Sequence, residues 1–245
     1  MYSNSLRRLS CLIRSQIGEN IINNNIKTYY NNTHTIENCK YIVDKYNGDD
    51  WLLFKYLINL HQPKLDKLYD ANKLKYANTQ NKENELDSKI YYMNEKYYLQ
   101  KKEKDYYKLK LPYTDSNDWF DMYIIKWSPS SLSPIHNHPE LGCILHILEG
   151  EILETKYDHD INLENQTLLT TDQNYDINLK TTYIDDSQNY HTMSNISCKP
   201  AYTLHIYSYN PLYKHKLCIF DEKTKTKTKT KTKKKDFNLL RYIII

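Results

Sequence analysis

Over the first sixty residues, apolar side chains recur at steps of three and four, as in IENCKYIVDKYNGDDWLLFKYLI from residue 36. This spacing is typical of amphipathic helices, which bury one face against a core. Asn47 and Gly48 interrupt the pattern and are poor helix formers. The N-terminal segment, residues 1–60, therefore predicts helices that pack on a larger unit, with a break near residue 47.

Further along the chain the hydrophobic period changes from about 3.6 residues to two, which is the period of a half-buried strand. Gly150 separates two of these segments and predicts a tight turn between them. The alternating segments are DMYIIKW from residue 121, CILHILEG from 143, EILETKYD from 151, AYTLHIYSY from 201 and HKLCIFD from 215. They predict a mainly β unit over residues 106–221.

Two further segments lack a clear hydrophobic period. Residues 61–105 are rich in Lys, Asn, Glu and Tyr, which predicts an exposed low-complexity insertion that is partly helical or disordered. Residues 222–245 begin with a Lys and Thr tract that cannot bury enough apolar surface to fold alone. We expect a solvated tail there rather than an arm that binds nucleic acid.

Composition narrows the class of protein. A chain of 245 residues can form one sizeable core. The formal charge of +4 is small and much of the Lys excess lies in one tract, so we expect neither nucleic acid nor a membrane surface as a partner. No apolar run approaches the roughly eighteen residues that a membrane span needs.

The cysteines and the N-terminal sequence indicate in which cellular compartment the protein is expected. Five cysteines occur without CxxC spacing, and no apolar signal segment opens the chain, so we expect a reducing environment, the cytoplasm. The opening MYSNSLRRLSCLIRS, with three Arg and no acid, is also compatible with a mitochondrial presequence. Helical spacing of Leu6, Leu9, Leu12, Ile13 and Ile17 leads us to favour a helix that packs on the core.

The stretch SPIHNHPELGCILHILEGEI, residues 133–152, places two histidines one residue apart. On an extended strand, His136 and His138 project from the same face, as in many metal sites. Cys143 and Gly150 follow, and His191 stands four residues before Asn195. A single HxH pair would be weak support for a metal site, but this ordered set is more specific.

The ordered set resembles the two motifs of the cupin superfamily, whose paired strands deliver metal ligands into a jelly-roll barrel. With WSPSSLSPIHNH (127–138), NYHTMSN (189–195) and YTLHIYS (202–208), it is similar to the cysteine dioxygenase family within that superfamily. The resemblance extends weakly to YIVDKYNGDDW (41–51). It implies a mainly β fold, a cupin jelly-roll barrel with an N-terminal helical segment.

Carried over to this chain, the resemblance implies that His136, His138 and His191 hold Fe(2+). Three neutral imidazoles leave the metal its full charge and several open positions, whereas zinc has no redox chemistry. Thr203, His205 and Tyr207 match the family's Ser, His and Tyr relay, and Tyr113 matches a substrate-binding position. Cys143 matches the residue that forms a thioether with the tyrosine. Taken alone, Cys143 would be interpreted as a small core residue.

The resemblance implies an iron-dependent thiol dioxygenase that converts L-cysteine and O2 to cysteine sulfinic acid and acts as a monomer. Two alternatives stay open. One is a dioxygenase of cysteamine or of an N-terminal peptide cysteine. The other is a non-enzymatic cupin that binds zinc or nickel. Oxygen consumption with cysteine and metal analysis would separate the enzyme from the binding protein.

Two segments depart from the family. Its WGPG segment is WSPS here, so Ser128 and Ser130 replace glycines that permit unusual backbone angles. Its arginine, which grips the substrate carboxylate, is Asp115, and an acid cannot hold a carboxylate. Another cation such as Lys110 or Lys126 takes over, or the substrate lacks the carboxylate, or activity is reduced.

Overall fold

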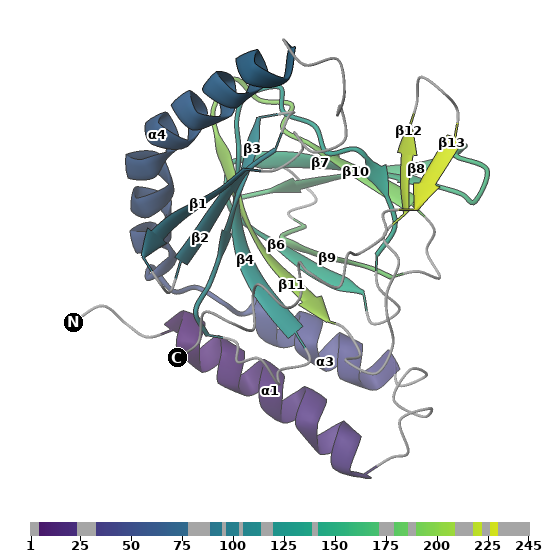
Figure 1. Ribbon diagram of the computed structural model, residues 1–245. Helices are drawn as coiled ribbons and strands as arrows, with labels where there is room; N and C mark the ends of the chain where they lie inside the picture. The colour runs from purple at the N-terminus through teal and green to yellow at the C-terminus, as the bar shows by residue number, and fades with distance from the viewer. Residues whose placement is uncertain are drawn as a thin grey trace.

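The computed structural model describes residues 5–23, 33–77, 89–94, 97–102, 105–113, 120–138, 142–171, 179–185, 190–208, 218–221 and 226–229. Some side chains near the ends of these ranges are not described. Within these ranges the chain folds into helices followed by two β-sheets (Figure 1). The mainly β prediction is confirmed.

The helices are α1 (Ser5–Asn23), α3 (Thr33–Asp44) and α4 (Trp51–Ala77), and the predicted break falls between α3 and α4. In α1, Leu6, Leu9 and Ile13 are buried whereas Leu12 is 51% exposed. The helix interpretation of this segment is therefore confirmed, and one of its predicted core residues, Leu12, faces solvent. The side chain of Ile17 lies outside the described residues.

Asp50 fixes the N-terminal helices to one another. Its carboxylate accepts hydrogen bonds from the Leu6 backbone N–H (2.7 Å), the Ser5 hydroxyl (2.6 Å) and the Tyr46 hydroxyl (2.8 Å). These bonds satisfy a backbone donor in the first turn of α1, which has no partner inside the helix. The start of α1 is thereby tied to the segment between α3 and α4.

The first sheet has seven strands in the order β1-β2-β3-β4-β11-β6-β9. Their bounds are β1 Lys89–Asn94, β2 Tyr97–Lys101, β3 Tyr106–Lys110, β4 Phe120–Trp127, β11 Ala201–Ser208, β6 Cys143–Glu149 and β9 Thr181–Ile184. In Figure 1, α4 runs beside β1 and β2, and α1 and α3 lie next to the β4, β11 and β6 end of the sheet.

The second sheet has six strands in the order β13-β12-β5-β10-β7-β8. Their bounds are β13 Thr226–Lys229, β12 Cys218–Asp221, β5 Ile135–His136, β10 Tyr190–Ser194, β7 Glu151–Tyr157 and β8 Leu163–Thr170. The named strands pair only in antiparallel fashion. Two antiparallel sheets that face one another form the cupin jelly-roll barrel that the sequence predicted.

The period of two sorts side chains to the two faces of the first sheet. On β4, Met122 and Ile124 join a cluster with buried residues of the helices, such as Leu6 and Phe54. Ile125 and Trp127 join a second cluster with residues of the other sheet, including Ile152 and Met193. One face of the first sheet therefore packs on helices, and the other forms the barrel interior.

Residues 61–105, predicted as an exposed low-complexity insertion that is partly helical or disordered, form a helix and two strands where the structure describes them; the helix agrees with the prediction, whereas the strands and the buried side chains do not. Helix α4 continues through Pro63 to Ala77, and β1 and β2 extend the first sheet. Leu65, Tyr69 and Leu99 are buried, and Lys101 forms an ion pair with Asp66 at 2.8 Å. A few apolar positions among many polar ones suffice for packing, although they leave little trace in the composition.

Part of the predicted solvated tail also forms regular structure. Thr226–Lys229 is strand β13, which pairs with β12 at the edge of the second sheet. Strand pairing uses backbone groups, and β-branched Thr favours it, so the Lys and Thr alternation is compatible with an edge strand. Residues 222–225 and 230–245 lie outside the described residues.

Two turns bear on the predictions. Gly150 has a φ of +85° between β6 and β7, and a Cβ there would lie 3.0 Å from Ala201, which confirms the predicted turn. The Ser131 N–H donates to the Ser128 carbonyl (3.1 Å), and Ser130 has a φ of +60°. Proline at the second position and positive φ at the third define a type II turn, so Ser130 takes a conformation that favours glycine.

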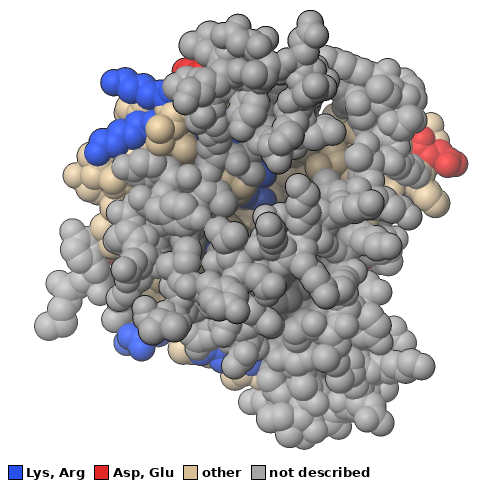
Figure 2. All heavy atoms as spheres, in the orientation of Figure 1, with Lys and Arg blue, Asp and Glu red and all other residues tan. Residues whose placement is uncertain are grey.

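Among the described residues on the face drawn in Figure 2, Lys and Arg lie in separate groups and no continuous basic stripe is visible. None of the helices that the structure describes combines the length and apolar character needed to cross a membrane.

Candidate metal centre

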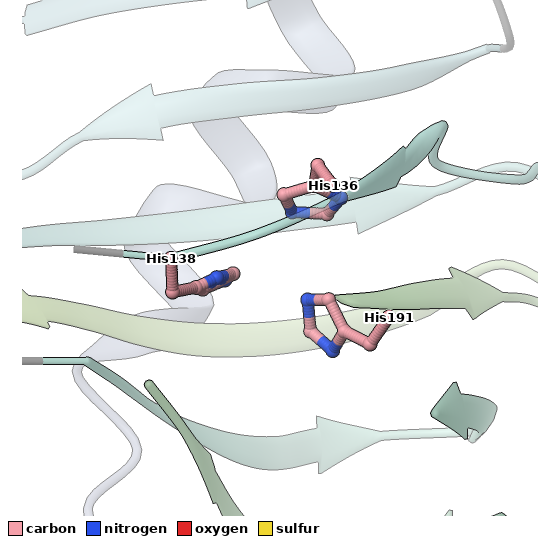
Figure 3. A group of neighbouring side chains, drawn as sticks. All are labelled: His136, His138 and His191. Carbon is pink, nitrogen blue, oxygen red and sulfur yellow. The ribbon is translucent and has the colours of Figure 1, made fainter. Parts of the chain in front are cut away.

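The second sheet brings the three predicted histidines together. β5 and β10 pair so that His136 lies directly opposite His191, and residues opposite one another in an antiparallel pair project from the same face. His138 follows two residues later, just beyond the end of β5, and its ring joins the other two. The nitrogen ligand atoms of the three rings all lie within 4.8 Å of one another. Figure 3 shows the rings facing a common space.

Several ring nitrogens in this cluster are buried without a partner. His138 and His191 are 1% and 2% exposed. Both nitrogens of His138 and Nε2 of His191 have no hydrogen-bond partner among the described residues. Leaving a buried polar atom unsatisfied costs about 1–3 kcal/mol, so a cation that binds one nitrogen of His138 and Nε2 of His191 would remove part of this penalty. The donor set fits a metal ion.

The Nδ1 atoms of His191 and His136 have hydrogen-bond partners outside the cluster. Nδ1 of His191 donates to Oε1 of Glu154 at 2.9 Å, and Nδ1 of His136 donates to the backbone carbonyl of Pro134 at 2.8 Å. When Nδ1 carries the proton, Nε2 keeps its lone pair for a metal. Such hydrogen bonds fix both the tautomer and the ring orientation of metal-binding histidines.

Electrostatics favour the neutral imidazole. Burial, aided by repulsion from His191, lowers the pKa values of His136 and His138 well below the usual range. Burial alone would raise the pKa of Glu154, but hydrogen bonds from His191 and Thr182, together with nearby charges, hold it below its ordinary value. At neutral pH the rings of His136 and His138 are therefore uncharged, and the Glu154 side chain next to His191 is a carboxylate.

Glu154 was not predicted as a site residue. It lies on β7, is fully buried, and also accepts a hydrogen bond from the Thr182 hydroxyl of the first sheet at 2.8 Å. In EILETKYD, Ile152 and Glu154 share the inward face of the strand. An acid at an inward position of an alternating strand is the sequence signal that could have identified it.

The first sheet presents a second polar cluster to the barrel interior. Thr203, His205 and Tyr207 share one face of β11, as predicted. The Thr203 hydroxyl lies 2.9 Å from Nε2 of His205, and the Trp127 indole donates to the same hydroxyl at 2.8 Å. Because indole only donates, Thr203 accepts from Trp127. Nδ1 of His205 lies 3.4 Å from the Tyr207 oxygen, so one imidazole ring contacts both hydroxyl groups.

Tyr207 joins the two clusters. Its ring stacks on that of His138 with centroids 5.6 Å apart and an interplanar angle of 28°. Burial raises the pKa of the Tyr207 phenol well above its usual value, so the phenol is protonated at neutral pH and can donate a hydrogen bond. A small molecule bound at the three histidines would lie near this donor.

Cys143 lies where a bond to Tyr207 could form. The two residues are directly opposite one another in the β6–β11 pair, and Sγ is 3.8 Å from Nδ1 of His205. Cβ atoms of opposite residues in an antiparallel pair are about 4.5–5.5 Å apart. Burial raises the pKa of the Cys143 thiol, so the side chain is a thiol.

The residues that the sequence suggested for carboxylate binding lie in different parts of the chain's structure. Tyr113 packs edge-on against Phe54, with ring centroids 6.1 Å apart, and joins the helix-side cluster. Its substrate-binding role stays a prediction. Lys110 forms an ion pair with Asp121 at 2.6 Å. Asp115 lies outside the described residues.

Lys126 and Lys108 lie on opposite faces of the first sheet. Lys126 donates to the side chains of Asn59 and Gln62 of α4, both at 2.6 Å, and so faces the helices. Lys108 was not predicted, and its ammonium donates to the Tyr207 hydroxyl at 3.1 Å. The pattern YYKLK gave little signal for it, because a lysine on a short strand more often faces solvent.

The hydrogen bond from His191 to Glu154 can be tested by mutation. Glu154→Gln keeps the shape of the side chain but removes the charge that orients and polarises His191. We expect the affinity for Fe(II) to fall about 10- to 100-fold, measured under anaerobic conditions by competition with a chelator. His146→Gln is a matched control, because His146 is buried on the helix-side face of β6. Equal iron affinity in Glu154→Gln and wild type would contradict this role.

Comparison with known proteins agrees with this site. Residues 102–223 match the family model described as cysteine dioxygenase type I. Cysteine dioxygenases type 1 of Rattus norvegicus and Homo sapiens are each 32% identical over 93 residues, which cover 38% of this chain and 46% of the relative. The enzyme of Danio rerio is 30% identical over 95 residues. The chain thus spans about half the length of the curated relatives it matches.

A solved structure described as a sugar phosphate isomerase from a cupin superfamily, from Silicibacter pomeroyi, is 15% identical. It covers 51% of this chain and 76% of its own, with a TM-score of 0.36, and has no bearing on function here. The family model matches the segment that carries the three histidines, Cys143 and the β11 cluster. The chain belongs to the cysteine dioxygenase family of the cupin superfamily.

Proposed function

We propose that this protein is an iron-dependent thiol dioxygenase and that free L-cysteine is its substrate. The observation that carries the proposal is the convergence of three imidazoles next to a protonated tyrosine. His136, His138 and His191 would hold Fe(2+), which when bound supplies the redox chemistry that zinc lacks. Membership of the cysteine dioxygenase family supports the same reaction.

The proposed reaction balances without an organic cofactor. A thiol and one O2 give a sulfinic acid, so that both oxygen atoms end on sulfur. Sulfur loses four electrons and O2 gains four, and no external reductant is consumed. The partners are therefore a small-molecule thiol and O2. A monomeric state and a cytoplasmic location stay predictions.

The residues of the first sheet would orient the reactants. Tyr207 can donate its phenolic proton to a substrate or oxygen atom near the histidines, because its pKa is raised. His205 would orient the phenol, and Thr203 would orient the ring of His205 through the contact at its Nε2. A hydrogen-bonded chain of this kind restricts the phenol to one rotamer, which lowers the entropy lost on reaching a reactive geometry.

We further infer a thioether between Cys143 and the ring of Tyr207. Forming it breaks the S–H bond of the thiol and one C–H bond of the ring, and O2 is the oxidant that takes up the two electrons and two protons. Their opposite positions in the β6–β11 register support this bond. The bond would hold the phenol oxygen in place near the metal centre.

The function is tested by oxygen uptake. Iron-loaded protein should consume one O2 per cysteine and release cysteine sulfinic acid, identified by mass spectrometry. Zinc-loaded protein is the control and should consume none, because zinc has no redox chemistry. Oxidation of cysteamine or of an N-terminal cysteine peptide in preference to cysteine would favour the first alternative. Metal binding with no oxygen uptake from any thiol would favour a non-enzymatic cupin.

The thioether is tested by intact mass. After turnover with iron, cysteine and O2, we expect a fraction of the protein to be lighter by two hydrogen atoms. Cys143→Ala and Tyr207→Phe, with their own sequence masses as references, should show no such loss. If the wild-type mass stays unchanged while Cys143 remains alkylatable in the unfolded protein, the bond does not form.

A further inference from the structure

Lys108 places a cation on the barrel side of the first sheet. Its neighbours Tyr107 and Leu109 belong to the helix-side cluster, whereas Tyr106 belongs to the interior cluster. Alternation along β3 therefore directs Lys108 inward. The Lys108 ammonium donates to the Tyr207 hydroxyl at 3.1 Å and lies 4.9 Å from the centre of that ring.

The other lysines of β3 and its neighbouring strands discussed above have acidic or amide partners. Lys110 pairs with Asp121 at 2.6 Å and Lys101 with Asp66 at 2.8 Å, and Lys126 donates to two amide oxygens of α4. Within the part of the chain that the structure describes, Lys108 forms no ion pair. Its contacts are a phenol and aromatic rings.

A cation in this position is costly without an anion. Removing an ammonium group from water is unfavourable by several kcal/mol unless a partner compensates, and cation–π contacts with Tyr207 and Tyr123 return only part of that. Burial, with a smaller effect from Lys102, lowers the pKa of Lys108 to about 7. The residue is still half-buried rather than fully enclosed, so a small anion could reach it.

The position of Lys108 relative to the three histidines limits the ligand. Tyr207 lies between them, since its hydroxyl accepts from Lys108 and its ring stacks on His138 at 5.6 Å. One side chain thus separates the ammonium from the candidate metal ligands. A ligand that contacts both must be compact and must carry a metal-binding group and an anionic group a few bonds apart. A thiol with a carboxylate meets this requirement.

We propose that Lys108 binds the carboxylate of the substrate and thereby selects carboxylate-bearing thiols over amine-only thiols. This inference rests on the proposed function, and it names Lys108 rather than Lys110 or Lys126 as the cation. An ammonium acts as a point charge and makes fewer fixed hydrogen bonds than the planar fork of a guanidinium. The Tyr207 phenol is available as a second donor to the same carboxylate.

The test measures equilibrium binding rather than turnover. Iron-loaded wild type, Lys108→Met and Lys108→Arg are titrated anaerobically by calorimetry with three thiols. These are cysteine, 3-mercaptopropionate, which keeps only the carboxylate, and cysteamine, which keeps only the amine. In Lys108→Met, we expect the affinity for both carboxylate thiols to fall roughly 10- to 100-fold and the affinity for cysteamine to stay unchanged. Lys108→Arg should recover a large part of the loss.

Lys110→Met is the matched control, because it removes a lysine from the same face of the same strand, and it should bind all three thiols as wild type does. Iron content, measured for every variant, reports whether the barrel is intact. Equal weakening for all three thiols in Lys108→Met would overturn the inference, because Lys108 would then only hold Tyr207. Unchanged affinities would overturn it as well. If wild type binds no thiol and consumes no O2, the proposed function itself fails.

Discussion

The antiparallel register between β5 and β10 places His136 opposite His191, and the candidate metal centre depends on that single alignment. Side chains alternate between the two faces of a strand, so a slip of one residue would turn one ring away from the others. β5 is only two residues long and cannot hold its register by itself. β12 pairs with it on one side and β10 on the other, and the type II turn at Ser128–Ser131 directs the chain from β4 toward it.

The chemistry comes from two sheets that face one another. The second sheet and the residues just after β5 contribute the candidate metal ligands and Glu154, which are nitrogen and oxygen groups suited to a cation. The first sheet contributes Tyr207 with its hydrogen-bonded support, a set of groups suited to donating a proton. The sheets meet at the stacking of Tyr207 on His138 and at the hydrogen bond from Thr182 to Glu154. The packing of the two sheets therefore determines where the two clusters lie relative to one another.

Local patterns in the sequence were enough to predict the site residues that lie two positions apart on one strand. The step of two between His136 and His138, and between Thr203, His205 and Tyr207, predicted which side chains share a face, and the structure agrees. Lys108 could not be found in this way, because its role depends on a strand far away in the chain, whereas the inward position of Glu154 on an alternating strand was a local signal that the prediction left unused. Composition likewise gave no indication that α4 continues or that β1 and β2 form. The free energy gained by burying a few residues such as Leu65 and Leu99 can stabilise a segment in which most residues are polar.

The central claim is that three imidazoles, and no other side chain, hold the metal. X-ray absorption spectroscopy of the iron-loaded protein without substrate tests it most directly, because the scattering of imidazole rings differs from that of sulfur or carboxylate ligands. We expect three imidazoles with the remaining scatterers being light atoms from solvent, and a loss of imidazole scattering in His138→Ala if that variant retains iron at all. A sulfur ligand from Cys143, or an imidazole contribution of two in the wild type, would contradict the account.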